Sequence, residues 1–315
     1  MYLPNMAKTP QPVFSGSVLM RQDKQMIKAP EIFDNLQIVR NRNRAAQNFQ
    51  QSDFLKQLAV ERLADRLDLM RRDFDTIIDV GAHGGYVARM LGGHEKLSKI
   101  ISLDPSQAFV EQATQHGPSS VMPVETLPKN LGTVDGIVSL LYLHQINDLP
   151  GLMKQMAATL KPDGLFFAVL FGGRTLQELR ACLSAAEEEI LGGISPHVAP
   201  MADIRDVGGL LGRAGLALPV ADSELLTVTY SSIFKLMHDL RAMGEGNSLI
   251  GRRTSLSRRD LFLRTAEIYQ ERYGRDDGTI PASFELIHLT AWSPDKSQQK
   301  PLRPGSAKMS LKDVL

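Results

Sequence analysis

Short apolar runs alternate with segments of helical periodicity between residues 73 and 175. A buried parallel strand is apolar on both faces, and a helix normally connects it to the next parallel strand. The alternation therefore predicts an α/β fold with a doubly wound, mostly parallel sheet. We expect strands in the following apolar runs: 77–80, 100–103, 121–124, 136–141 and 165–170.

The segments on either side of this region have helical patterns. Leucines recur at helical spacing after Asp53 and predict one helix before the sheet. Thr175 and Glu178 have the spacing of a capping box, which predicts the start of a helix that ends near Leu191. Less regular patterns predict further helices near 203–214, 231–242 and 257–273.

These patterns divide the chain into five segments. The first segment is basic, and the last is rich in proline and polar residues, so neither is expected to build a core. The segments are a disordered or targeting segment at 1–30, an N-terminal helical segment at 31–72, an α/β core at 73–175, a helical insertion with the remaining core elements at 176–292, and a polar C-terminal arm at 293–315.

The first strand of the core leads into a glycine-rich turn. The chain reads Ile-Ile-Asp-Val-Gly-Ala-His-Gly-Gly from Ile77 to Gly85, and a helical pattern follows. Glycine permits a left-handed backbone and the close approach of a ligand. Asp104 ends the next apolar run, where a carboxylate can accept hydrogen bonds from the ribose of an adenosine cofactor. The pattern therefore predicts a nucleotide-cofactor site.

Composition limits the classes of protein that remain. The chain has 315 residues, 43% hydrophobic content and a net charge of +1, which is typical of a soluble globular protein. A charge this close to zero argues against general nucleic-acid binding. No apolar run is long enough for a transmembrane helix. Cys182 is the only cysteine, which excludes intramolecular disulfides and cysteine-based zinc sites.

The glycine turn differs from the dinucleotide fingerprint Gly-x-Gly-x-x-Gly. Asp79, Gly81 and Gly85 have acidic-x-Gly-x-x-x-Gly spacing, which resembles motif I of class I S-adenosylmethionine-dependent methyltransferases. In that motif the acidic residue organises the loop around the methionine portion of the cofactor. His83 stands where the motif usually has its middle glycine. The resemblance implies a seven-stranded sheet of the class I methyltransferase type and S-adenosylmethionine as cofactor.

Nine further stretches go beyond this general pattern, at 43–46, 61–67, 143–150, 160–166, 171–180, 192–200, 210–215, 243–247 and 297–307. Together they resemble the family of mitochondrial complex I assembly factor 5 and its bacterial relatives. The match covers nearly everything after Glu31. Gln145 is a departure, because the family generally has tryptophan at that position.

This resemblance implies a protein of the mitochondrial matrix, peripheral to the inner membrane, or of the cytoplasm if the source is bacterial. The activity of the family is hydroxylation of an arginine in a complex I core subunit, and that subunit would be the protein partner. Two alternatives stay open. One is S-adenosylmethionine-dependent methylation of a protein or a small molecule, and the other is a non-catalytic assembly chaperone.

The resemblance also implies which residues bind the cofactor. Glu125 would follow the third strand and lie near the adenine. The complete set is Asp79, Gly81, Ala82, His83 and Gly85 in the loop, Asp104 and Pro105 after the second strand, and Glu125.

His144, Asn147 and Asp148 follow the fourth strand, at the edge of the sheet where ligands bind in such folds. A histidine beside a carboxylate would serve as an acid/base pair or as part of an iron site. The alternative is that Asn147 and Asp148 cap the next helix while His144 packs under the cofactor. The spacing of His197 gives no support for a second metal ligand, so no metal site is predicted.

Overall fold

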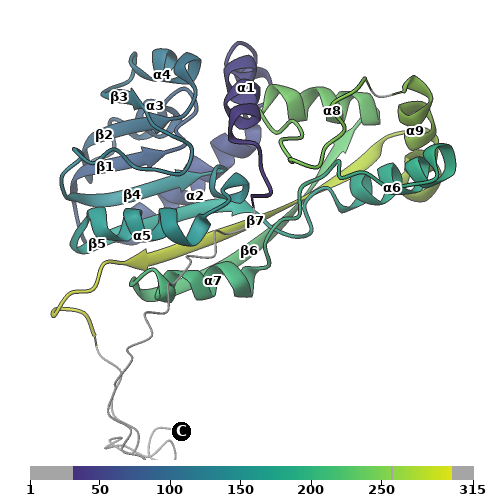
Figure 1. Cartoon of the computed structure of the whole chain (residues 1–315). Helices are drawn as coiled ribbons and strands as arrows, with labels where there is room; N and C mark the ends of the chain where they lie inside the picture. Colours follow the sequence, from purple (N-terminus) through teal and green to yellow (C-terminus); the bar gives the residue numbers. More distant parts are fainter. Residues whose placement is uncertain (1–30, 257, 300–315) are drawn as a thin grey trace, which may run out of the picture.

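The computed structural model describes residues 31–256 and 258–299 of the chain, and these form one seven-stranded sheet flanked by helices (Figure 1). The strand order is β3-β2-β1-β4-β5-β7-β6, and only β7 runs antiparallel to its neighbours. This confirms the predicted α/β class and the mostly parallel sheet. The strands are β1 Phe74–Val80, β2 Leu97–Asp104, β3 Ser119–Val121, β4 Val134–Leu140, β5 Leu160–Phe171, β6 Ala217–Tyr230 and β7 Ile280–Trp292.

Helices cover both faces of the sheet. One face packs against α2, α3 and α6, and the opposite face packs against α5 and α7. The helices are α1 Asn35–Ala45, α2 Phe54–Leu69, α3 Tyr86–Leu91, α4 Gln107–Ala113, α5 Leu149–Thr159, α6 Gln177–Leu191, α7 Ile204–Arg213, α8 Ile233–Ala242 and α9 Arg259–Tyr273, with short 3-10 turns at Phe49–Gln51 and Leu143–Gln145. The predicted segments 1–30 and most of 293–315 lie outside the described residues.

Successive residues of the central strands enter opposite cores. Ile77 and Phe167 belong to the core under α2 and α3, whereas Ile78 and Phe166 belong to the core under α5 and α7. This is the alternation that a strand imposes on its side chains. Because both faces are covered, both sets are apolar, and the strands read as continuous apolar runs in the sequence.

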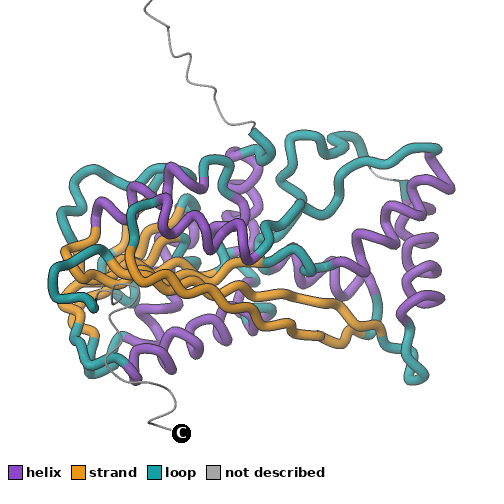
Figure 2. The backbone as a smooth tube through the Cα atoms, turned by 90° about the horizontal axis from the view of Figure 1, so that it is seen from below, coloured by secondary structure: helices purple, strands orange, loops and turns teal. Residues whose placement is uncertain are grey.

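The last two strands extend beyond the rest of the sheet. The C-terminal half of β7 pairs with β5, whereas its N-terminal half pairs only with β6. Figures 1 and 2 show this two-stranded ribbon running from the parallel strands towards α6, α8 and α9. Neither strand was predicted from the sequence. The extension creates a second compartment beside the core, closed by helices at its far end.

The predicted capping box at Thr175 and Glu178 was wrong. The helix α6 begins at Gln177, and the residue before it, Leu176, has a φ of +54° with no side-chain cap. Glu178 instead accepts hydrogen bonds from the backbone and hydroxyl of Ser283, and Thr175 exchanges two hydrogen bonds with the backbone of Glu285. Both residues therefore anchor β7 to the start of α6.

Candidate functional site

The glycine turn lies where the strand order reverses, between the carboxyl ends of β1 and β4. Ligands of doubly wound sheets bind at this switch point. Gly81 and Gly85 have left-handed φ values of +75° and +73°, as the sequence predicted for a tight turn. A Cβ on Gly81 would lie 2.2 Å from Cγ of Tyr142. The turn is therefore packed tightly against the residues that follow β4.

Asp104, the predicted ribose ligand, is held by the protein itself. Its two oxygens accept hydrogen bonds from Nε and Nη2 of Arg42, at 3.2 and 2.5 Å. The backbone amides of His83 and Ser106 each donate another, both at 2.9 Å. A carboxylate offers about four acceptor positions, so all of them are used. Burial alone would lower the pKa of Arg42, but the charge of Asp104 outweighs it and raises that pKa.

His83 fills space inside the turn. Its ring stacks on Phe49 with centroids 4.7 Å apart. Nδ1 lies 2.9 Å from the carbonyl oxygen of Gly81, and Nε2 lies 3.1 Å from Nη1 of Arg42. An arginine can only donate, so Nε2 accepts and Nδ1 carries the proton. Burial and the positive charge of Arg42 hold the pKa of His83 well below its usual range, which keeps the ring neutral.

The ammonium of Lys56 lies between the carboxyl ends of β1 and β4. Its ammonium donates to the carbonyl oxygens of Gly81 and Leu140, at 3.2 and 2.9 Å, which join the ends of β1 and β4. Asp79 is completely buried and neither of its oxygens has a well-formed hydrogen bond, although the Val87 amide faces it. Burial lowers the pKa of Lys56 to about 8 and raises the pKa of Asp79 to about 6, and the opposite charge of each partner limits the shift.

These residues do not fit a bound adenosine cofactor in the described conformation. The loop has the required left-handed glycines, and the buried Asp79 carboxylate is available. Asp104, the predicted ribose ligand, is saturated, however. The space under the loop that His83, Lys56 and Glu245 line is only about 10 Å³, enough for about one water molecule. Arg42 would have to leave Asp104 before a nucleoside entered.

The other predicted cofactor residues have structural contacts. Ala82 is buried and its amide donates to the carbonyl oxygen of Leu103, while Pro105 is buried beside Asp104. Glu125 accepts hydrogen bonds from Asn147 and from the backbone amide of Asp148. Glu125 therefore holds the turn after β4, and its position near an adenine stays a prediction.

The structure separates the three predicted catalytic residues. The carboxylate of Asp148 accepts from the Gly151 amide at the start of α5, and Asn147 binds the backbone of Ile32 and Phe33. The Asp148 bond is an N-cap and favours the capping alternative for that residue, whereas Asn147 joins the turn after β4 to the segment before α1. His144 points elsewhere, with Nε2 3.0 Å from Glu245 and the ring against Phe171. A catalytic role for the three residues stays a prediction.

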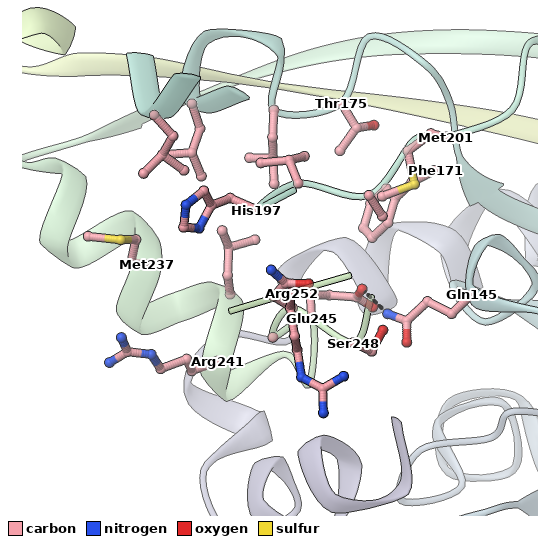
Figure 3. A pocket seen from close by; sticks show the side chains of 18 of the residues that line it. Gln145, Phe171, Thr175, His197, Met201, Met237, Arg241, Glu245, Ser248 and Arg252 are labelled. Atoms are coloured by element: carbon pink, nitrogen blue, oxygen red, sulfur yellow. Dashed lines mark hydrogen bonds between the residues drawn. The ribbon is translucent and has the colours of Figure 1, made fainter. Parts of the chain in front are cut away.

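A cavity of about 320 Å³ lies next to the glycine turn, in the compartment formed by the long ribbon (Figure 3). Its walls come from α6, α8, the loop after β5 and the segment 245–253. Most of the lining is apolar, with Phe171, Leu179 and Met237 among its side chains. This volume lies within the range typical of small-ligand sites, whereas the space under the glycine turn does not.

One carboxylate, Glu245, lines this cavity, and a second, Glu187, contacts the lining residue His197. Glu187 is buried and accepts from the amide and hydroxyl of Ser195 and from His197. Burial alone would raise the pKa of Glu187, but these hydrogen bonds outweigh it and lower that pKa. Glu245 lines the cavity directly, and Gln145 donates to it (Figure 3). Glu245 and Phe171 also line the space under the glycine turn, so they separate the two regions.

Arg42, Lys56 and Glu245 were not predicted as site residues from the sequence. Arg42 lies beside the stretch 43–46 and Glu245 lies within 243–247, and both stretches carry the family resemblance. Lys56 interrupts an otherwise apolar helix stripe, and it is almost completely buried. A charged residue on the buried face of a helix is the one signal that pointed to a special role.

Two further features concern metals and membranes. Among residues 31–256 and 258–299, no group of three or more His, Cys, Asp or Glu side chains is arranged to hold a metal ion. Within the same residues, none of the helices has the length and apolar character needed to cross a bilayer.

The fold and the glycine turn define a protein of the class I methyltransferase type. Residues 78–168 match the family described as "Methyltransferase domain". The YcgJ protein of Bacillus subtilis has the same fold, with a TM-score of 0.51 and 14% identity over 74% of this chain and 98% of that one. A methyltransferase structure from Bacillus halodurans gives 0.51 and 15% over 74% and 99%.

Sequence comparison places the chain in a narrower family. It is 38% identical to "Arginine-hydroxylase NDUFAF5, mitochondrial" of Rattus norvegicus, over 91% of this chain and 84% of that protein. The human protein of that name is 37% identical over 83% and 76%. The malonyl-(acyl-carrier protein) O-methyltransferase of Xylella fastidiosa is 33% identical over 84% and 89%.

The chain belongs to the NDUFAF5 arginine-hydroxylase family, which confirms the family predicted from the sequence. Relatives are named as a hydroxylase or a methyltransferase, so the prediction of an enzyme is also confirmed.

Proposed function

We propose that this chain hydroxylates an arginine of a complex I core subunit during complex I assembly. The observation that carries the proposal is the cavity of about 320 Å³ that shares Phe171 and Glu245 with the space under the methyltransferase-type turn. A protein side chain that enters this cavity would end beside the residues of the switch point. Relatives at 36–39% identity are named arginine-hydroxylases, which supports the choice of substrate.

Hydroxylation sets a chemical requirement. One C–H bond of the arginine becomes C–OH, so one oxygen atom of dioxygen enters the substrate and the other leaves as water. A two-electron donor must supply the electrons for that water. The described residues assign no group to oxygen activation, so our proposal for this chain extends to holding and orienting the arginine.

We also propose that the glycine turn binds S-adenosylmethionine in a second conformation, after Arg42 has left Asp104. The left-handed glycines, the buried Asp79 and the fold support this. The test is calorimetric titration of S-adenosylhomocysteine into wild type, Arg42→Ala and the double variant Arg42→Ala/Asp104→Asn. We expect binding to strengthen in the first variant and to weaken again in the second. Equal affinity in all three proteins would exclude Asp104 as the ribose ligand.

Two other functions have specific support. Methylation is favoured by the similarity to the malonyl-(acyl-carrier protein) O-methyltransferase of Xylella fastidiosa. A non-catalytic assembly chaperone is favoured by the saturated Asp104 and the small space under the turn. The chaperone predicts that complex I assembles normally in cells that carry Gly85→Asp, which disrupts the turn.

The mitochondrial names of the relatives support a location in the mitochondrial matrix, and we propose peripheral contact with the inner membrane there.

Mass spectrometry of the partner subunit distinguishes the three functions. Subunits from wild-type and deletion cells are digested and compared. Hydroxylation predicts an arginine peptide that gains the mass of one oxygen atom only in wild type. A gain of one methylene group would establish methylation, and identical spectra would leave the chaperone.

A further inference from the structure

We infer that Glu245 is the residue that selects a guanidinium group in the cavity. The inference rests on the proposed function, because it names the group that binds the substrate arginine. No family name or comparison assigns a role to this residue.

The backbone around Glu245 fixes the direction of its side chain. The chain turns at Gly244, which has a φ of +85°, and the Glu245 amide donates to the carbonyl oxygen of Leu240 at the end of α8. On the other side, Nδ2 of Asn41 donates to the carbonyl oxygen of Gly246 at 2.8 Å. A Cβ on Gly246 would lie 3.1 Å from that same nitrogen. Hydrogen bonds on both sides of Glu245 therefore fix the turn that carries its carboxylate.

The hydrogen bonds of Glu245 leave one oxygen available. His144 and Gln145 both donate to Oε2. Among the described residues, Oε1 accepts no hydrogen bond. Glu187 is a useful contrast, because both of its oxygens are used by Ser195 and His197. Glu245 is thus the carboxylate in this compartment that has capacity for a ligand.

Neither Arg42 nor Arg252 forms an ion pair with Glu245, although the charge of Glu245 acts on Arg42. Arg42 is committed to Asp104, and Arg252 forms an ion pair with Asp34 at 2.8 Å. The side chain of Glu245 is only 12% exposed. A carboxylate that is this buried is stabilised by a cation with matching hydrogen bonds. Glu245 therefore favours a cationic ligand over a neutral one.

The groups that line the cavity favour a guanidinium over an ammonium. A guanidinium is planar, always charged, and can donate two parallel hydrogen bonds to one carboxylate. Phe171 lies at the wall next to Glu245, with its ring packed against His144 and Phe284. The apolar walls suit the methylene stem of an arginine, which is buried readily when its head is paired. Gln145 would give way to the incoming nitrogen atoms.

The rim of the cavity adds a second feature of the substrate. Arg241 and Arg253 are exposed and line its opening. Two cations at the opening disfavour a cationic peptide and favour acidic residues on either side of the target arginine. The expected substrate is therefore an arginine in an acidic segment of a protein.

The experiment is titration of a capped pentapeptide, acetyl-Glu-Ala-Arg-Ala-Glu-amide, into the full chain, followed by protein NMR. The matched peptides replace arginine with citrulline, which is neutral and similar in shape, or with lysine. We expect the arginine peptide to bind wild type at least about tenfold more tightly than the citrulline peptide. In Glu245→Gln this preference should disappear. Glu188→Gln, an exposed glutamate on α6, is the control and should keep it.

Each outcome has a distinct meaning. An arginine preference that is unchanged in Glu245→Gln overturns the role of Glu245. The same conclusion follows if wild type shows no preference for arginine over citrulline. Preserved thermal unfolding of Glu245→Gln shows that loss of preference is not loss of folding. The proposed function has a separate test in the mass of the partner subunit, so either proposal can fail while the other stands.

Discussion

The space under the glycine turn and the neighbouring cavity differ in almost every physical property, although they share a wall. At the turn, Arg42 binds Asp104 and Lys56 binds backbone carbonyl oxygens, and the space under it is about 10 Å³. In the cavity, about 320 Å³ is lined mainly by apolar groups, and Oε1 of Glu245 accepts no hydrogen bond from the part of the chain that the structure describes. The region with the clearer sequence motif is therefore closed, and the region without one is open. A motif identifies the ancestry of a site, whereas partners and volume decide whether it is ready to bind.

The largest expected effect comes from overfilling the closed region with Gly81→Ala. The added Cβ would lie 2.2 Å from Tyr142 in a left-handed backbone with φ of +75°. Overpacking costs up to about 3 kcal/mol and left-handed strain about 1–2 kcal/mol, so we expect a loss of about 4 kcal/mol. Urea unfolding measures it, with Gly93→Ala as control because nothing lies within 4 Å of that Cβ. Equal stability of the two variants would show that the turn is loosely packed.

Arg42→Ala is expected to open the closed region at a smaller cost. Removing one partner of a buried ion pair costs about 3–5 kcal/mol. We expect the lower limit, because Asp104 keeps the hydrogen bonds from His83 and Ser106. Thermal unfolding with and without S-adenosylhomocysteine measures both consequences. Wild type should respond weakly to the ligand and the variant strongly. A variant that is destabilised but unresponsive would mean that releasing Asp104 does not open the site.

Lys56→Met tests the charges under the turn through pH. The folded protein lowers the pKa of Lys56 from 10.5 to about 8. Between these values the unfolded chain binds the proton and the folded chain does not, so wild-type stability rises with pH in this window. The variant lacks this contribution. We expect the stability of wild type to increase relative to Lys56→Met by up to about 3 kcal/mol from pH 8 to 10.5.

Urea unfolding of wild type and Lys56→Met at several pH values gives this difference. Lys154→Met on α5 is the control, because the side chain of Lys154 is exposed. If the difference in unfolding free energy between the two proteins stayed constant with pH, the pKa of Lys56 would be the same in the folded and unfolded chains. The ammonium would then be in contact with water.

The smallest effect is expected at the shared wall. Gln145→Ala removes one of the two donors to Oε2 of Glu245, and His144 still donates to it. We expect a stability change below about 1 kcal/mol, because the glutamine is only partly buried. The arginine peptide should bind slightly more tightly, since it no longer displaces the amide. Weaker binding would indicate that Gln145 contacts the peptide.

The sequence predicted the parallel part of the fold well, for a physical reason. Strands buried on both faces are continuous apolar runs, so β1 and β4 were visible without a structure. By contrast, β6 has one side exposed and alternates weakly, and its pairing with β7 joins residues far apart in the chain. Thr175 and Glu178 had the spacing of a cap, yet β7 offered them stronger partners. Long-range partners of this kind leave no local pattern.

The sequence predicted the glycine turn and the strand end at Asp104, but not the partners that their side chains bind. The glycine turn and Asp104 lie where the motif implied. Their closure depends on Arg42, which comes from a helix before the sheet, and on Lys56, which reaches the switch point from α2. The cavity depends on the ribbon and on α8, which the sequence did not connect to the core. Spacing along a chain identifies groups on one element, whereas a site between elements requires their packing.

Helix α1 forms hydrogen bonds with residues of both regions. It carries Arg42, which binds Asp104, and Asn41, which holds the turn at Gly246 beside Glu245. Displacement of this helix would alter both regions together. A guanidinium that bound more tightly to one position of α1 would then change the affinity for a nucleoside. Because thermodynamic linkage is reciprocal, the nucleoside would change the affinity for the guanidinium by the same factor. The two sites would then act as a single cooperative unit.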